Sequence, residues 1–287
     1  MAALPPVCPW RLDIVRAMLR GTHDPQSPLH QLQSDHRLLE LIIRGWVWPE
    51  VLVNSARLWA PELFLGVLIA EMLKVNPGVA EAKLREKLVL NPDGSIKSWY
   101  LYDCGLRALP ELFGAIVTTG NLWLYYNELT SLPDSFGLII VGESLMLYNN
   151  QLSSLPDSFG SITVGSSLYL YNNELSSLPD SFGSITVGED LRLDNNQLSS
   201  LPDSFGSITV GGDLDLSNNE LSSLPDSFGS ITVGEHLSLN NNQLSSLPDS
   251  FGLIIVGGDL DLRNNQLDQH NISSSVLPNV NGDLLKN

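Results

Sequence analysis

Cysteines and long apolar runs are scarce in this sequence of 287 residues. The two cysteines, Cys8 and Cys104, cannot build a disulfide framework, which favours a reducing compartment. The longest apolar run, from Leu63 to Ala70, is far short of the ~20 residues that span a bilayer, so we expect no membrane segment. The first residues lack a basic segment followed by an apolar one. We therefore expect no secretory signal and a cytoplasmic protein.

Basic residues are scarce in the second part of the chain. Residues 1–98 carry 11 Lys and Arg against 10 Asp and Glu, whereas residues 99–287 carry 4 against 22. A segment this acidic repels phosphate backbones, which argues against nucleic acid as a partner. Two interpretations of the charge stay open: it keeps a long exposed array in solution, or it attracts a basic partner.

A unit of 23 residues recurs through this acidic part, and one copy runs from Leu145 to Ser167. A fixed period of this length predicts a stacked-repeat architecture. Such an architecture favours an extended binding surface over a catalytic pocket. Further copies begin at Trp99, Leu122, Leu168, Leu191, Leu214, Leu237 and, in part, Leu260.

Each unit carries the pattern of a short strand followed by a turn. Leu145 and Leu147 alternate with other residues, which predicts a strand with one buried face. Asn150 is expected to bond backbone groups where the chain leaves the strand. Phe159 recurs in every copy, which predicts one ring per layer in a stacked spine. The return segment is too short and too β-branched for a helix, so we expect extended chain or a single turn there.

The pattern Leu145-x-Leu-x-x-Asn-x-Leu152 resembles the leucine-rich repeat, and the first copy has Cys104 at the place of the asparagine. The Leu-Pro-Asp-Ser-Phe-Gly segment resembles short repeats with a Leu-Pro turn. Where the family has its first leucine, this chain has glycine after valine, as in Val164-Gly165, and we expect the valine to take the buried place. The resemblance implies an α/β solenoid with a parallel β-sheet on its concave side, a surface that usually binds protein partners.

The repeats divide the chain into three parts. Residues 99–267 form the predicted solenoid of seven full repeats and one partial repeat, and residues 268–287 form a C-terminal cap or a flexible tail. Residues 1–98 are predicted to form a small helical domain, which either caps the solenoid or docks a second partner. A turn is expected at residues 91–94, just before the repeats. Helices are expected over residues 10–19, 32–43, 49–59, 61–74 and 77–88.

The copies differ from each other mainly at two positions that should face the concave surface. These positions follow the first leucine of each strand by one and by three residues, and they are aromatic or Met in the first copies and polar in the last. Aromatic residues on an exposed sheet are typical anchors of an interface, and cross-strand stacking that only stabilises the sheet is the alternative. The candidate partner-binding residues are Tyr100, Tyr102, Trp123, Tyr125, Tyr126, Met146, Tyr148, Tyr169, Tyr171, Arg192 and Asp194.

The sequence offers little for catalysis. Cys104 occupies a structural repeat position and His236 stands alone at the edge of a strand, so we expect no enzyme activity, no metal site and no cofactor. The favoured function is a non-catalytic module that binds a protein on its concave face, anchored by the aromatic half. One alternative is an adaptor or effector whose residues 1–98 dock a larger machine. The other is a structural subunit, or a binder of ordered surfaces through rows such as Thr163 and Thr186.

Overall fold

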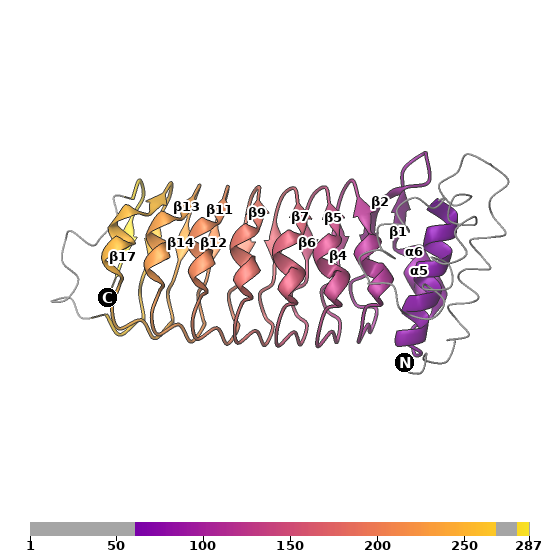
Figure 1. Cartoon of the computed structure of the whole chain (residues 1–287), viewed down its shortest axis with the longest axis horizontal. Coiled ribbons are helices and arrows are strands. Elements are labelled where there is room, and N and C mark those ends of the chain that lie inside the picture. The colour runs from indigo at the N-terminus through magenta and orange to yellow at the C-terminus, as the bar shows by residue number, and fades with distance from the viewer. Residues whose placement is uncertain (1–60, 268–279, 287) are drawn as a thin grey trace, which may run out of the picture.

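The computed structural model describes residues 61–267 and 280–286. The helices expected over residues 10–19, 32–43 and 49–59 lie outside the described residues. The described part is a stack of layers with α5 and α6 at its N-terminal end (Figure 1). None of its helices is long and apolar enough to cross a membrane.

The N-terminal end of the stack is formed by two helices and a hairpin. Helix α5 (Pro61–Val75) confirms the helix expected over residues 61–74. Its buried Leu68 and Met72 belong to the same apolar cluster as the leucines of the repeats. Asn76, directly after α5, donates from Nδ2 to the Ala108 oxygen over 2.8 Å, which fastens the helix to the first repeat.

The helix expected over residues 77–88 is confirmed only in its middle part. Helix α6 covers only Glu81–Glu86, and strand β1 (Leu88–Leu90) follows it and pairs antiparallel with β2 (Ile96–Tyr100). The pattern of a short apolar run is compatible with a helix and with a strand, and the turn after the run determines which of them forms. Residues 91–94 form the expected turn, in which the Gly94 N–H donates to the Asn91 oxygen over 2.9 Å. That turn folds the apolar run back onto β2.

The inner sheet has ten strands, ordered β1-β2-β4-β6-β8-β10-β12-β14-β16-β17. All pairs beyond β1–β2 are parallel, and each repeat lies in register with the next, as in Leu168, Leu191 and Leu214. The segment that follows residue 279 adds the last strand, β17 (Leu284–Leu285), against β16. The other strands are β4 (Leu122–Trp123), β6 (Leu145–Met146), β8 (Leu168–Tyr169), β10 (Leu191–Arg192), β12 (Leu214–Asp215), β14 (Leu237–Ser238) and β16 (Leu260–Asp261).

The return segments form 3-10 helices and a second, seven-stranded parallel sheet. This confirms the expected single turn and extended chain. Pro156 holds an extended conformation ahead of its 3-10 helix, and the β-branched residues after Ser161 favour a strand. The 3-10 helices are η1 (Glu111–Ala115), η2 (Asp134–Leu138), η3 (Asp157–Ser161), η4 (Asp180–Ser184), η5 (Asp203–Ser207), η6 (Asp226–Ser230) and η7 (Asp249–Leu253). The strands are β3 (Val117–Thr118), β5 (Ile140–Val141), β7 (Thr163–Val164), β9 (Thr186–Val187), β11 (Thr209–Val210), β13 (Thr232–Val233) and β15 (Ile255–Val256).

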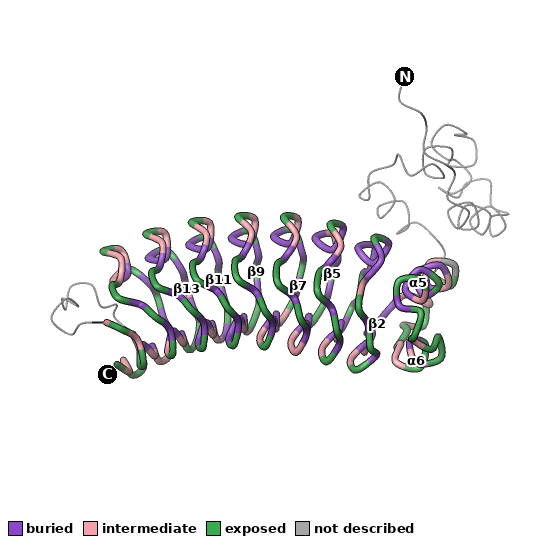
Figure 2. The backbone as a smooth tube through the Cα atoms, turned by 90° about the horizontal axis from the view of Figure 1, so that it is seen from below, coloured by how far each residue is buried: buried purple, intermediate pink, exposed green. Residues whose placement is uncertain are grey.

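The phenylalanine of each layer forms the predicted spine. Phe159, Phe182 and Phe205 stack with 6.1 Å between neighbouring centroids and are fully buried. Strands of one sheet lie only ~4.8 Å apart, so the layers must fan out toward the rings. Figure 2 shows this fan, with the layers closer together on the side opposite the 3-10 turns. The ten-stranded sheet is therefore the concave face.

The recurring asparagine confirms its predicted role. Asn173 is buried, and its Nδ2 donates to the Leu147 oxygen over 3.1 Å and to the Leu170 oxygen over 3.0 Å. Its Oδ1 accepts from the Leu152 N–H over 3.1 Å. One amide thus joins backbone groups of two adjacent layers where the strands end. The same pattern is found in the layers above and below.

Valine takes the buried place that the family gives to its first leucine, as expected, and Val164 is 4% exposed. The glycine after it allows neighbouring layers to approach. A Cβ on Gly165 would overlap the Gly142 carbonyl oxygen of the preceding layer, a backbone atom that cannot turn aside.

Gly165→Ala is expected to lower the free energy of unfolding by about 1–3 kcal/mol, because the layers must separate to admit the methyl group. Gly66→Ala is the matched control. Gly66 lies inside α5, and no atom lies within 4 Å of the place that a Cβ would take, so alanine there should be stabilising by about 1 kcal/mol. Urea denaturation measures both. Equal effects of the two substitutions would contradict the close layer contact.

Candidate functional site: the aromatic half of the concave face

Four tyrosines stack along the concave face, one from each of the first four repeats. We call Tyr102, Tyr125, Tyr148 and Tyr171 the tyrosine ladder. Their ring centroids lie 5.0, 4.5 and 4.4 Å apart in chain order, and neighbouring planes differ by 6° to 8°. Each of these tyrosines comes two residues after the end of its strand and two before the buried asparagine, or before Cys104 in the first repeat. The constant register of the sheet therefore aligns the rings. All four are half-buried, with their ring edges on the surface.

A cation closes each end of the tyrosine ladder. The Lys87 Nζ lies 3.5 Å from the centroid of the Tyr102 ring, and Arg192 lies 4.9 Å from the centroid of Tyr171. A cation over a tyrosine face is attracted by the ring quadrupole. Lys87 follows α6 and lies outside the repeats, so the repeat pattern gives no signal for it.

A second row of predicted site residues runs along the strands beside the tyrosine ladder. Tyr100 contacts Trp123 with 4.5 Å between ring centroids, and Tyr169 lies 6.2 Å from Tyr171. Met146 is half-buried between these pairs, on the strand that joins them. The structure therefore brings the aromatic candidates and Met146 together on one surface.

The indole of Trp123 carries a donor without a partner. Its Nε1 is buried and has no hydrogen-bond acceptor among residues 61–267 and 280–286. An unpaired buried N–H costs about 1–3 kcal/mol. The indole ring itself is half-buried, so the fold accepts this cost to hold a tryptophan within the aromatic surface.

Burial raises the pKa of four tyrosines on this surface. The effect is largest for Tyr148, and Tyr125, Tyr169 and Tyr171 shift in the same direction. The neighbouring phenols act in the same direction on Tyr148, because two phenolates side by side would repel. These four side chains thus stay neutral at physiological pH and present hydroxyl groups rather than charges.

The C-terminal end of the aromatic surface is an ion network. Arg192 donates from Nε to Asp194 over 3.0 Å and contacts Asp215 over 3.3 Å. The sequence places Asp194 on the surface, yet it is 3% exposed beneath Arg192. Its burial, and next the charge of Asp215, raise the pKa of Asp194, while Arg192 opposes this. Asp194 therefore fixes Arg192 over the ladder rather than facing solvent.

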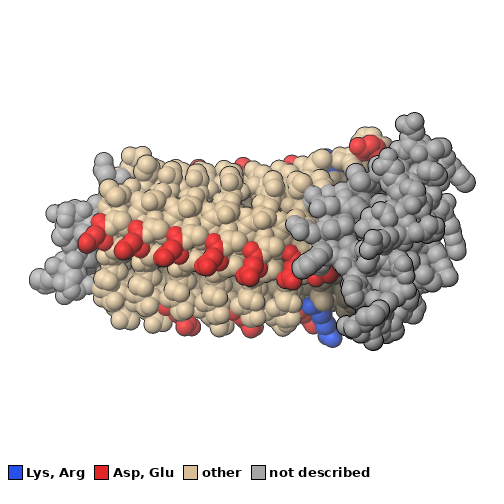
Figure 3. Space-filling model, in the orientation of Figure 1, with Lys and Arg blue, Asp and Glu red and all other residues tan. Residues whose placement is uncertain are grey.

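The three arginines of the repeats are all paired with carboxylates of the array. Arg107 contacts Glu128 over 2.9 Å, and Arg263 contacts Asp261 over 2.6 Å; Arg192 is the third. The convex face adds a row of acidic side chains across the 3-10 helices (Figure 3). The exposed carboxylates at the first position of these helices are Asp134, Asp157, Asp180, Asp203, Asp226 and Asp249. The outward field of the described array is thus negative.

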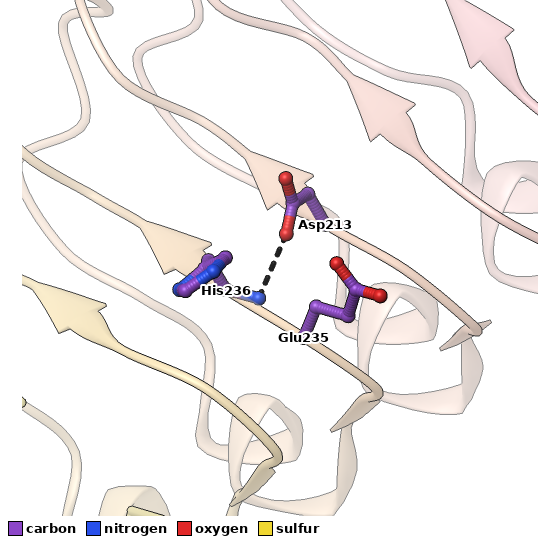
Figure 4. A group of neighbouring side chains, drawn as sticks. All are labelled: Asp213, Glu235 and His236. Carbon is purple, nitrogen blue, oxygen red and sulfur yellow. Dashed lines mark hydrogen bonds between the residues drawn. The ribbon is translucent and has the colours of Figure 1, made fainter. Parts of the chain in front are cut away.

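His236 does not stand alone, and the interpretation from the sequence is wrong here. The structure brings it beside Asp213 and Glu235, with ligand-type atoms within 4.8 Å of one another (Figure 4). Two of these side chains already bond the backbone of the next layer. Asp213 Oδ1 accepts from the His236 N–H over 2.8 Å, and His236 Nδ1 accepts from the Asp259 N–H over 3.0 Å.

Cys104 is buried at its structural position in the first repeat. Its backbone N–H donates to Asn127 Oδ1 over 3.0 Å, which ties it to the asparagine of the next layer. Burial raises the pKa of its thiol, although Lys87 and Lys83 oppose the shift. A buried, protonated thiol is a poor nucleophile.

The fold and its constant 23-residue register define a leucine-rich repeat solenoid. A family model described as Leucine Rich Repeat matches residues 213–231 and 235–254, which cover strands and turns near the C-terminal end of the array. The chain thus contains leucine-rich repeats.

Two solved structures are similar to this chain. The Shigella effector LRR domain shares 21% identity and a TM-score of 0.44, and the match covers 72% of this chain and 90% of that one. YopM from Yersinia enterocolitica WA-314 shares 20% identity and a TM-score of 0.37, over 79% of this chain and 61% of that one. No curated protein matches the sequence.

Proposed function

We propose that the chain is a non-catalytic module that binds a protein partner across its concave sheet, with the aromatic half as the anchor. The observation that carries this proposal is the position of the variable residues. The copies differ on the inner face, whereas the exposed segment around Ser153 and Asp157 is repeated almost unchanged. Exposure alone therefore does not account for the variation.

The size and chemistry of the surface support a protein ligand. Ten strands at ~4.8 Å give a sheet roughly 40 Å long, enough for an interface of about 800 Å² per partner. Tyrosine and tryptophan supply large contact areas and hydroxyl or N–H donors, and they dominate the energetics of interfaces. The half-buried phenols of the tyrosine ladder can supply such donors.

Cross-strand stacking is the competing explanation of the tyrosine ladder. Parallel rings 4.4 to 5.0 Å apart stabilise a sheet whether or not a partner binds. The two explanations differ in what happens to affinity, and not only to stability, when rings are removed.

The double variant Tyr148→Ala/Tyr171→Ala is expected to weaken binding by at least about tenfold, because it removes two central anchors. The partner is first identified by crosslinking in the native source, and its dissociation constant is then measured by calorimetry. Asp157→Ala/Asp180→Ala is the matched control, since it changes the same two layers on the convex face. Circular dichroism melts confirm that both variants fold.

Wild-type affinity in the tyrosine variant would leave stacking as the only role of the ladder. A loss of affinity in the aspartate variant would place the interface on the convex face instead. Loss in the tyrosine variant alone is the result that the proposal expects.

A further inference from the structure

Tyr126 occupies a position where a tyrosine is costly. Its φ is 53°, in the left-handed region, which a bulky side chain adopts only at a cost. Asparagine and aspartate tolerate this region, and every other described repeat has one of them there. They are Asp103, Asn149, Asn172, Asn195, Asn218, Asn241 and Asn264, with φ between 50° and 57°.

Burial does not compensate for this strain. Tyr126 is 59% exposed, the largest exposure of any aromatic side chain that the structure describes. An asparagine would serve the fold better at this position. Strain held in an exposed aromatic residue points to a function outside the fold.

Tyr126 also forms a corner against the tyrosine ladder. Its ring lies at 71° to Tyr125 and 75° to Tyr148, with centroids 5.5 and 5.9 Å away. The Tyr126 ring is therefore roughly perpendicular to the rings of the tyrosine ladder, and much of its surface stays exposed to solvent. The corner opens into a shallow hollow of about 650 Å³. Its lining is Tyr102, Asp103, Tyr125, Tyr126, Asn127 and Asn149.

The chemistry of the hollow suits an organic cation. It combines phenol rings with the carboxylate of Asp103, which pairs with no cation within the described ranges. The protein itself places Lys87 and Arg192 on the outer rings of the same ladder. The hollow offers rings of the same kind with a carboxylate beside them, and no side chain of the described residues places a cation over the Tyr126 ring.

We propose that the hollow at Tyr126 receives an arginine or lysine side chain from a basic segment of the protein partner. This rests on the proposed function and names the chemistry of the partner. The cation lies over the Tyr126 ring and beside the Asp103 carboxylate, as cations do in aromatic cages. The net negative charge of the array, in which every arginine of the repeats is already paired, attracts such a segment and repels an acidic one, and the Asp103 carboxylate supplies the local charge beside Tyr126.

The test uses a defined probe with the full chain. A short fluorescein-labelled Gly/Ser peptide carries three arginines, and its counterpart carries three citrullines, which keep the shape and lose the charge. Binding is measured by fluorescence anisotropy at about 0.15 M salt, which screens the non-specific attraction between the acidic surface and a basic peptide. We expect wild-type protein to bind the arginine peptide more tightly.

Tyr126→Asn is the central variant, because it installs the residue that the array uses at this position. It should melt no lower than wild type and bind the arginine peptide about five- to thirty-fold more weakly. Tyr126→Phe keeps the ring and should keep most of the affinity. Asp103→Asn should weaken binding, whereas Asp157→Asn, which removes an equal charge from the convex face, should not.

Two outcomes overturn the proposal. In the first, Tyr126→Asn binds the arginine peptide as well as wild type, so the field of the array alone attracts it. In the second, wild type does not distinguish arginine from citrulline. Neither outcome touches the broader function, which is tested separately by the Tyr148/Tyr171 variant and the native partner.

Discussion

Replacing Asn173 with alanine is expected to lower the free energy of unfolding by about 2–6 kcal/mol. The substitution leaves the buried Leu152 N–H without an acceptor, which costs about 1–3 kcal/mol. The two carbonyls lose less, because each has a second donor. The Leu147 oxygen still accepts from Asn150 and the Leu170 oxygen from Asn196. Each of these lost bonds costs about 0.5–1.5 kcal/mol.

The adjacent asparagine is the control for this experiment. Asn172 is exposed, has a φ of 52°, and its side chain donates to Asn149 Oδ1 over 2.9 Å. Asn172→Gly keeps the left-handed conformation available, so its free energy of unfolding should change by only about 0.5 kcal/mol. Urea denaturation of the two variants measures the difference. Similar losses in both would mean that the buried ladder is not what holds the strand ends together.

The asparagine ladder and the phenylalanine spine can be predicted because their positions recur at a fixed spacing. A residue that recurs every 23 positions must occupy the same place in every layer, so the role inferred for it in one copy applies to the other copies. Burial of Val164 can be predicted in the same way. Glycine stands where the family has its first leucine, so the valine before it is the apolar residue that can fill that buried place. Periodicity carries no such information outside the repeats. The sequence therefore favours a helix through Leu88, although the turn at residues 91–94 folds Leu88–Leu90 into a strand.

The sequence predicts which residues of the repeats line the concave face, but it does not predict how deeply each side chain is buried there. The structure brings the aromatic candidates together, but it buries Asp194 beneath Arg192. The burial of Asp194 depends on its contact with Arg192, two residues earlier, and the repeat spacing does not determine that contact. The contact of Lys87 with Tyr102 cannot be predicted from the repeat pattern, because Lys87 lies outside the repeats. The strain at Tyr126 does have a signal, since tyrosine replaces the Asn or Asp of the other layers.

Cooperativity between layers is the property that a repeat protein loses first when one layer is weakened. Each layer contacts only its neighbours, so stability is a sum of layer terms and interface terms. Phe182 lies in the middle of the spine, between Phe159 and Phe205, at 6.1 Å from each. Phe251 ends the described spine and has a single ring neighbour, Phe228, within the described residues. Equal substitutions at the two places should therefore have unequal effects.

Phe182→Ala is expected to lower the free energy of unfolding by about 3–5 kcal/mol, because it opens a cavity in a fully buried position. It also weakens two layer interfaces at once, so calorimetry should show the single transition broaden or divide as the halves of the array uncouple. Phe182→Leu retains most of the buried volume and should cost less than about 1.5 kcal/mol, with one transition. Phe251→Ala should lower stability less than Phe182→Ala and leave the transition single. If Phe251→Ala and Phe182→Ala gave the same loss and the same transition shape, the spine would not couple the layers, and the sheets would have to do so alone.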